Sequence, residues 1–153
     1  MKKLIHKNLQ NAQSGQSLVE FAISLTVILY LLVGAIEFGI ALFQYVQLRD
    51  AAQEGALYGA LHPDDDDGII AHVRAASSSP IDLQNDPGVV ITPDIDNSNG
   101  LPEKCEGDGI IVSITYPHRV FLPFVSSFIG SNTIPINVSV TDTVLLPICA
   151  TAP

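Results

Sequence analysis

Glu20 occupies the position in this sequence that is chemically most unusual. It stands at the head of a long apolar run in the stretch SGQSLVEFAISL, and no further charged residue follows until Glu37. A charged side chain at the centre of a bilayer costs roughly 2.5 to 3.5 kcal/mol on insertion scales, so an acid in such a run usually has a function. A cation that pairs with this carboxylate would relieve the cost of burying both charges.

Glu37 is the second acid of the apolar run. It follows Glu20 by 17 residues, which corresponds to roughly 25 Å along a helix that rises 1.5 Å per residue. At 100° per residue the two side chains do not share a helix face, so they do not form the paired carboxylates of a catalytic site. Two interpretations of Glu37 remain open: a place at the outer membrane interface, or a contact between helices.

Signals of catalysis are absent from the sequence. Ser126 and Ser127 lack the glycine elbow of a serine nucleophile, and no glycine-rich phosphate loop follows a predicted strand. The histidines show neither an HExxH motif nor any other ligand spacing; they are His6, His62, His72 and His118. We therefore expect a protein that is not an enzyme and that has no metal site and no cofactor.

Basic residues are concentrated at the N-terminus. The chain of 153 residues has seven basic and sixteen acidic residues, and three of the basic ones (Lys2, Lys3 and Lys7) precede Gly15, whereas no acid does. Because basic flanks of membrane segments tend to stay in the cytoplasm, we expect residues 1–15 to be cytoplasmic and the residues beyond about 43 to lie on the other side of the membrane. An acidic body also argues against a nucleic-acid partner, which requires a basic surface.

Residues 18–43 are apolar enough to cross a bilayer. This run of about 26 residues exceeds the roughly 20 that span a hydrocarbon core, and it is too long for the apolar core of a cleaved signal peptide, which has roughly 7 to 15 residues. Residues 44–61 contain no proline and keep the helical pattern up to Pro63. The sequence thus predicts one helix over residues 16–61, with 16–43 in the membrane and 44–61 as its extramembrane continuation.

Small residues recur every four positions along the distal half of this helix, in the pairs Ala51-Ala52, Gly55-Ala56 and Gly59-Ala60. This spacing places them on one helix face, where a second backbone can approach closely. Either the protein's own sheet or a neighbouring subunit can occupy that face, and both interpretations remain open. The glycines predicted to take part in helix packing are Gly34, Gly39, Gly55 and Gly59.

Residues 62–153 are expected to form an extracytoplasmic α+β head. Asp64 to Asp67 precede the segment GIIAHVRAASSS, whose apolar spacing predicts a short amphipathic helix. The four aspartates favour a capping role at the helix N-terminus, and calcium binding is the alternative. Residues 88–95, 109–117 and 133–146 are rich in β-branched residues between turn formers, which predicts a small antiparallel sheet of three strands beside the long helix.

The two cysteines lie next to predicted strands, Cys105 before the second and Cys149 after the third. If these strands are antiparallel neighbours, the start of one meets the end of the other and the two sulfurs come together. A disulfide is permitted outside the cytoplasm and would contribute roughly 4 kcal/mol in the chain-entropy model. The sequence therefore predicts a disulfide between Cys105 and Cys149, and the alternative is two thiols that stay reduced.

The N-terminal region resembles the processing site of type IV prepilins. A short basic leader ends at Gly15, and a glutamate, Glu20, opens an apolar helix five residues later. The resemblance implies that a membrane-embedded prepilin peptidase cleaves between Gly15 and Gln16 and removes residues 1–15. The new α-amino group is largely protonated at neutral pH. In a filament, Glu20 of one subunit would then pair with the Gln16 amine of its neighbour and fix the axial register.

Within this superfamily the sequence resembles most closely the TadE-like proteins, which are pseudopilins or minor pilins of tight-adherence (Flp-type, type IVb-like) pilus systems. The resemblance covers residues 15–60 and rests on VEF at 19–21, IEFG at 36–39, AAQEGA at 51–56 and YGA at 58–60. Gln53 and Leu57 depart from the family, in which basic residues are common at these two positions, so no charge pairing is inferred there.

This resemblance implies a non-enzymatic role in pilus assembly. The implied partners are the prepilin peptidase, other pilins or pseudopilins, the inner-membrane assembly platform and the lipid bilayer. The implied location is the cytoplasmic membrane, crossed once with the N-terminus in the cytoplasm and the C-terminal domain outside, or an extracellular pilus. The alternative function is that of a single-pass anchor which presents an acidic, ligand-binding extracytoplasmic head.

Overall fold

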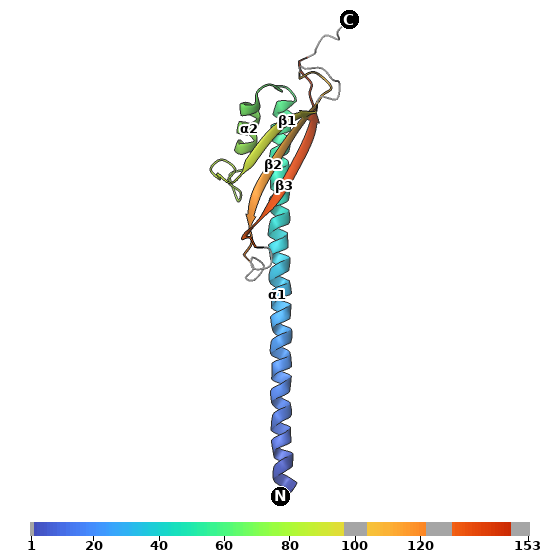
Figure 1. The fold of residues 1–153 in the computed structure, drawn as a ribbon, viewed down its shortest axis with the longest axis vertical. Helices are drawn as coiled ribbons and strands as arrows, with labels where there is room; N and C mark the ends of the chain where they lie inside the picture. The colour runs from blue at the N-terminus through green and yellow to red at the C-terminus, as the bar shows by residue number, and fades with distance from the viewer. Residues whose placement is uncertain (1, 97–103, 122–129, 148–153) are drawn as a thin grey trace. The chain divides into compact units, whose positions relative to one another are not determined.

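The fold was analysed in a computed structural model, which describes residues 2–96, 104–121 and 130–147, with side chains from Gly15 onward (Figure 1). The chain divides into two units, Met1–Gly39 and Ile40–Pro153. Its elements are α1 (Lys2–Gly59), α2 (Asp66–Ala75), β1 (Val90–Asp96), β2 (Gly109–Arg119) and β3 (Thr133–Thr143). The predicted α+β class, with a long helix, a short helix and a three-stranded antiparallel sheet, is confirmed.

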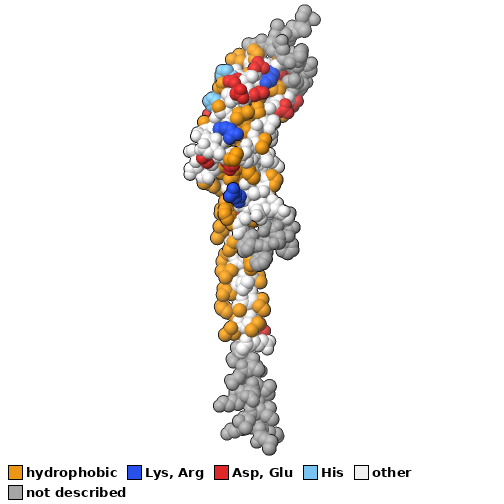
Figure 2. Space-filling view, turned by 60° about the vertical axis from the view of Figure 1, so that its left-hand side comes forward, with side chains coloured by type: hydrophobic (Ala, Val, Ile, Leu, Met, Phe, Trp, Pro, Cys, Tyr) orange, Lys and Arg blue, Asp and Glu red, His pale blue; other side chains and the backbone are white. Residues whose placement is uncertain are grey.

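The first unit contains an apolar stretch of α1. Between Gly15 and Gly39 the large apolar side chains are exposed, with Leu18 at 70 % and Leu31 at 69 % of their full accessible surface, and orange apolar side chains cover this stretch in Figure 2. A helix that is apolar on all sides requires an apolar surrounding, either a protein core or lipid. From Gly15 to Gly59 the helix is long and apolar enough to cross a membrane.

The observed helix starts earlier than predicted, at Lys2 instead of Gln16. Residues 2–14 contain neither proline nor glycine, and the lysines, leucines and glutamines among them are good helix formers, so nothing in their sequence interrupts the helix. The C-terminal end lies at Gly59, close to the predicted residue 61. The prediction is nearly right at this end because Pro63 cannot continue a helix.

The three strands form one sheet in the order β1-β2-β3, with both neighbouring pairs antiparallel. Ile114 of β2 lies opposite Ile91 of β1 and Val138 of β3, so apolar residues of all three strands share one face of the sheet. The observed strand ends differ from the predicted ones by at most three residues. The largest difference is at the end of β3, which stops at Thr143.

The core of the second unit lies on this apolar face of the sheet. Every second residue of the central strand β2 is buried, from Ile110 through Val112 to Ile114. The distal part of α1, the apolar side of α2, strand β3 and the connecting segments complete the core. Besides the β2 residues, it comprises Leu48, Ala51, Ala52, Ala56, Ala60, Ile69, Val73, Ile81, Leu83, Val89, Val138 and Val144. The small side chains of α1 allow the other elements to pack close to the helix axis.

The opposite face of the sheet is polar. Ser113 Oγ donates a 3.2 Å hydrogen bond to Ser139 Oγ, and Thr115 Oγ1 donates a 2.9 Å bond to Asn137 Oδ1. Such cross-strand pairs stabilise neighbouring strands without apolar burial. The alternation of apolar and polar positions therefore fixes which face of the sheet covers the core.

At the end of β2, a buried polar contact joins the sheet to α1. His118 is 3 % exposed, and its Nδ1 lies 2.6 Å from Oε1 of Gln44. An amide oxygen can only accept, so the imidazole donates from Nδ1. This contact fixes β2 against the first helical turns of the second unit.

Candidate functional site

The predicted processing residues lie on an exposed part of α1. Among the described residues, apart from the chain neighbours of Gly15 and the backbone of its own helix, no atom lies within 4 Å of the position that a Cβ on Gly15 would take. Glu20 is exposed, and its Oε1 accepts a 3.2 Å hydrogen bond from Nε2 of Gln16, one turn earlier. The ion pairs found among the described residues do not involve Glu20. The structure thus brings Gln16 and Glu20 together and leaves that carboxylate without a cation in the described part of the chain.

The four glycines predicted to pack fall into two groups. A Cβ on Gly55 would collide with Cγ2 of Val73 in α2, and a Cβ on Gly59 would lie 2.9 Å from Cγ1 of Ile110 in β2. At Gly34 and Gly39, such a Cβ would have no described atom within 4 Å apart from its chain neighbours and the backbone of its own helix. Gly55 and Gly59 therefore lie against the protein's own helix and sheet, and packing of any of the four against another subunit stays a prediction.

The aspartate run caps α2. Asp65 is the N-cap residue, and its Oδ1 accepts a 2.9 Å hydrogen bond from the backbone N–H of Gly68. Lys104 Nζ lies 3.3 Å from Asp66 Oδ1 and 3.9 Å from Asp64 Oδ1, and it donates a 2.6 Å hydrogen bond to the carbonyl oxygen of Pro63. The capping role predicted for this run is confirmed at Asp65. In the described part of the chain, no group of three or more His, Cys, Asp and Glu side chains is arranged to hold a metal ion.

An aromatic stack lies next to Asp65, the N-cap residue of α2. The ring of Tyr58 lies between the imidazoles of His62 and His72, with centroid distances of 4.5 Å and 4.1 Å, and its hydroxyl donates a 2.8 Å hydrogen bond to Asp65 Oδ2. The pKa of Asp65 is lowered, mainly by the hydrogen bond from the Gly68 N–H, then by that from Tyr58, with smaller contributions from the two imidazoles. These contacts favour the ionised carboxylate and so fix the turn between α1 and α2.

The predicted disulfide involves one described cysteine. Cys105 is buried, and its backbone N–H donates a 2.9 Å hydrogen bond to Oδ2 of the buried Asp108. The backbone N–H of Glu106 donates to the carbonyl oxygen of Pro147 at 3.0 Å, so the segments that lead to the two cysteines lie side by side. Cys149 lies outside the described residues, and the disulfide stays a prediction.

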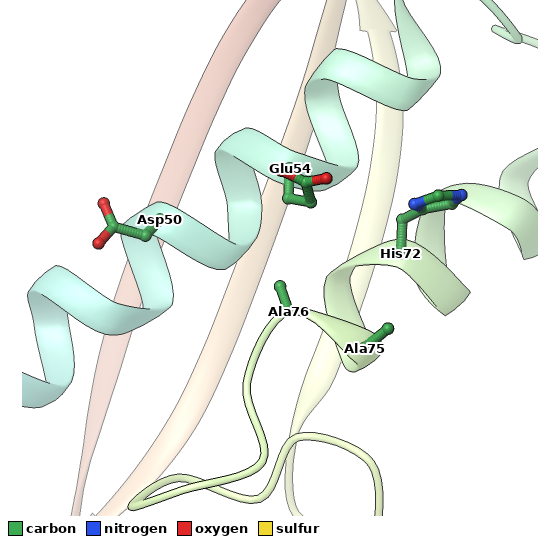
Figure 3. A pocket seen from close by; sticks show the side chains of 5 residues that line it. All are labelled: Asp50, Glu54, His72, Ala75 and Ala76. Atoms are coloured by element: carbon green, nitrogen blue, oxygen red, sulfur yellow. The ribbon is translucent and has the colours of Figure 1, made fainter.

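A polar groove lies between α1 and the C-terminal end of α2. It consists of a pocket of about 340 Å³ lined by Asp50, Glu54, His72 and Ala75–Ala76 and an adjoining pocket of about 220 Å³ lined by Gln47 and Ser77–Ser79, with Asp50 and Ala76 common to both. The Glu54 side chain is turned toward His72, whereas the Asp50 carboxylate points away from the other labelled side chains (Figure 3). We call these two pockets together the acceptor groove, because Gln47, Asp50 and Glu54, whose side chains carry hydrogen-bond acceptors, are among its lining residues.

The sequence patterns do not reveal the acceptor groove. Its only signal along the chain is a pair of acids one helical turn apart, Asp50 and Glu54, with no basic residue three or four positions from either on the helix. The residues that face α1 across the groove are His72 and residues 75–79, and they come to lie beside α1 only because α2 packs against it. The Tyr58 stack is hidden for the same reason, since His72 reaches the ring through the tertiary fold.

Comparisons with known proteins address the N-terminal region. Residues 15–57 match the family model described as TadE-like protein, so the predicted resemblance is confirmed over this range. No curated protein and no solved structure matches the chain. The matched range begins at Gly15 and includes Glu20, the apolar stretch and Gly55, and it ends two residues before Gly59. Over residues 15–57, this chain is similar to TadE-like proteins.

Proposed function

We propose that this protein is a minor pilin or pseudopilin that takes part in assembly of a tight-adherence pilus. A prepilin peptidase cleaves it between Gly15 and Gln16, and α1 holds it in the membrane over residues 16–43. The match to TadE-like proteins over residues 15–57 supports involvement in such a pilus system. Its partners in assembly are other pilins and the inner-membrane assembly platform, and residues 62–153 form the extracytoplasmic head.

The observation that carries this proposal is the position of Glu20. Its carboxylate is exposed on an apolar helix, one turn after Gln16, and already contacts the Gln16 side chain. Cleavage after Gly15 would create an α-ammonium group within reach of this helix face. A carboxylate in a low-dielectric surrounding gains most from a cation at short range.

The partner amine belongs to a neighbouring subunit in this proposal. A salt bridge between subunits would set the axial register of adjacent helices, because the carboxylate and the amine lie at fixed positions along α1. An ion pair formed only within one subunit would stabilise membrane insertion but would not fix the axial position of one subunit relative to the next. Loss of the Glu20 charge should therefore impair assembly and spare insertion.

The experiment is N-terminal sequencing of the protein extracted from the membranes of cells that carry the complete pilus system. A chain that starts at Gln16 is expected, and a chain that still starts at Met1 would support the single-pass anchor. Gly15→Ala should block cleavage, whereas Gly34→Ala, a glycine with equally open surroundings in the same helix, should leave it unchanged.

Variants of Glu20 separate maturation from assembly. Glu20→Gln keeps the size and the hydrogen bonding of the side chain but removes its charge, so we expect normal cleavage and membrane insertion with few or no pili. Glu20→Asp keeps the charge and should restore part of the assembly. Normal piliation by both Gly15→Ala and Glu20→Gln would refute the proposed role.

A further inference from the structure

The end of the sheet at which β2 stops lies level with the last turn of the proposed membrane segment. His118 Nδ1 donates a 2.6 Å hydrogen bond to Gln44 Oε1, and Gln44 directly follows residue 43, where α1 leaves the hydrocarbon in the proposed insertion. Residues 40–43 belong to the same unit as the sheet. The headgroup layer beyond the hydrocarbon is roughly 5 to 7 Å thick, which corresponds to about three to five residues of an α-helix. With this insertion, Gln44 and His118 lie at headgroup level.

Strand β2 runs along α1 toward the membrane. At the start of the strand, Cγ1 of Ile110 lies 2.9 Å from the position that a Cβ on Gly59 would take. Near the end of the strand, His118 contacts Gln44, which comes much earlier on the helix, so β2 is antiparallel to this part of α1 (Figure 1). The chain that follows His118 therefore continues toward the residues of α1 that precede Gln44.

The two outer strands of this hairpin stay paired beyond the last residue of β2. Arg119 lies opposite Thr133 at the start of β3, and the backbone N–H of Val120 donates a 3.0 Å hydrogen bond to the carbonyl oxygen of Asn132. We call the surface formed by Tyr45, Arg119–Phe121 and Thr133–Ile134 the β2–β3 end. Its residues lie beside Gln44 or on the membrane side of it.

Large apolar side chains are exposed at the β2–β3 end. Phe121 is 74 % exposed, more than any other large apolar residue that the structure describes, and Tyr45 and Ile134 are 41 % and 39 % exposed. Residues 122–129, which lie outside the described residues, continue the sequence as LPFVSSFI without a charge. Exposed apolar side chains that gather in one place mark a contact with a protein or a membrane, and aromatic rings are enriched where a membrane meets water.

Charge also distinguishes the β2–β3 end from the rest of the head. The chain has sixteen acids, and none of them occurs in the stretches that form this end, which are residues 40–46, 116–121 and 130–137. Arg119 is exposed there, and a guanidinium group matches the geometry of a phosphate. Asp86 acts electrostatically on Tyr116 from the loop before β1 and marks the boundary of this acid-free surface. Apolar area and positive charge together are what binds a protein surface to lipid.

From these observations we infer that the β2–β3 end rests on the extracytoplasmic surface of the bilayer that α1 crosses. The rings of Phe121 and Tyr45 lie at the boundary of the hydrocarbon, and Arg119 lies among the lipid phosphates. Lipid is present at this level around every inserted chain, whereas a partner protein would first have to displace it. The inference rests on the proposed insertion of α1, because the end of the membrane segment sets the level of Gln44.

The test uses tryptophan fluorescence, since the chain contains no tryptophan of its own. The full chain with Phe121→Trp is placed at one copy per nanodisc of phosphatidylcholine and phosphatidylglycerol, with or without bromine on the acyl chains near the headgroup. Bromine should quench this tryptophan. Leu61→Trp, at a position that is 46 % exposed beyond the other end of the sheet, should keep its fluorescence. Equal quenching of both, or quenching that requires several copies per nanodisc, would overturn the inference.

A tryptophan in the membrane segment separates this inference from the proposed function. Phe38 is 69 % exposed on α1, so Phe38→Trp should be quenched by brominated lipid if α1 crosses the bilayer. Quenching of Phe38→Trp without quenching of Phe121→Trp would overturn the inference and leave the proposed function intact. A lack of quenching in both variants would overturn the insertion of α1 and the inference with it. Cleavage of the leader does not affect either measurement.

Charge reversal tests the contact of Arg119 with phosphate. Arg119→Glu, added to Phe121→Trp, should reduce the quenching in nanodiscs that contain phosphatidylglycerol, because the new carboxylate is repelled by the anionic headgroups. Arg49→Glu makes the same change of charge at an exposed position of α1 on the far side of Gln44 from the membrane and should reduce the quenching less. Circular dichroism checks that both variants keep the fold. An equal reduction in the two would show general attraction to the bilayer and overturn the inference.

Discussion

The two described parts of α1 have the same secondary structure but opposite surroundings. Between Gly15 and Gly39 the large apolar side chains are exposed, and in the described part of the chain no other element lies within 4 Å of a Cβ built on Gly34 or Gly39. Between Ile40 and Gly59 the side chains of Leu48, Ala51, Ala52 and Ala56 are fully buried or nearly so.

The difference shows that side-chain size, more than apolarity, decides what covers each part of the helix. The first part carries large residues on all sides, so only a surrounding that is apolar everywhere, such as lipid, can cover it. The second part has small residues on one face, and there α2 and β2 approach the backbone closely. One continuous helix is therefore apolar enough to cross a membrane in one part and is a component of a folded core in the other.

The largest effect is expected from the core side of this comparison. Ile110→Ala removes a fully buried side chain of β2 that faces Gly59 of α1, and it should lower the free energy of unfolding of the head by about 2 to 5 kcal/mol. Urea unfolding in detergent, followed by near-ultraviolet circular dichroism, measures this loss. Leu29→Ala, at a position that is 52 % exposed, is the control and should leave the midpoint unchanged.

A pair of glycine variants tests the comparison within the helix itself. Gly55→Leu places a side chain into the space filled by Val73 and should destabilise the head by about 1 to 3 kcal/mol through overpacking. Gly34→Leu adds the same side chain where no neighbour is within 4 Å and should leave head stability unaffected. Equal destabilisation by both variants would contradict the division of α1 into two parts.

The smallest effect concerns the turn that connects the core part of α1 to α2. The pKa of Asp65 lies below its ordinary value of 3.8 in the folded protein, so its contribution to stability is present above that value and is lost as the pH falls through the lowered pKa. Asp65→Asn should therefore make the free energy of unfolding less dependent on pH in acid.

Urea unfolding of Asp65→Asn and of the wild type at a series of acidic pH values measures this change in the free energy of unfolding. Part of the dependence should remain in Asp65→Asn, because the Asn85 side chain also holds the pKa of Asp82 low. Asp96→Asn, at an exposed position on β1, should reproduce the wild-type curve. If the free energy of unfolding of Asp65→Asn fell in acid as it does in the wild type, the ionisation of Asp65 would make no contribution to the stability of the fold.

Periodicity was enough to predict the architecture because each element carries its own pattern. The apolar run of α1, the spacing of Ile69 and Val73 in α2 and the β-branched strands all reflect local geometry. The start of α1 was not predicted because the cleavage motif suggested a boundary at Gln16, whereas helix formation depends only on the absence of a breaker before it. A processing signal and a structural boundary need not coincide.

Tertiary sites were less accessible from the sequence. In the structure α2 and β2 approach Gly55 and Gly59 closely, but which elements do so depends on how α2 and β2 fold back, and the helix-packing role of the four glycines stays a prediction. The acceptor groove joins Asp50 and Glu54 to residues about 20 positions further on, and no local pattern encodes that juxtaposition. The Gly15–Gln16 cleavage and the pairing of Glu20 stay predictions that rest on the resemblance and on the position of the carboxylate.

Lys104, which pairs with Asp64 and Asp66, offers a practical way to follow the folding of the head. Lys104 is the one lysine beyond the leader, since the other three precede Gly15, and its Nζ is held by Pro63 and Asp66. An amine-reactive dye would therefore report on two chemically distinct groups in a trimmed chain, the new terminus and this tethered side chain. The reactivity of Lys104 toward the dye would rise when the tether opens, which provides a direct optical readout of the integrity of the head.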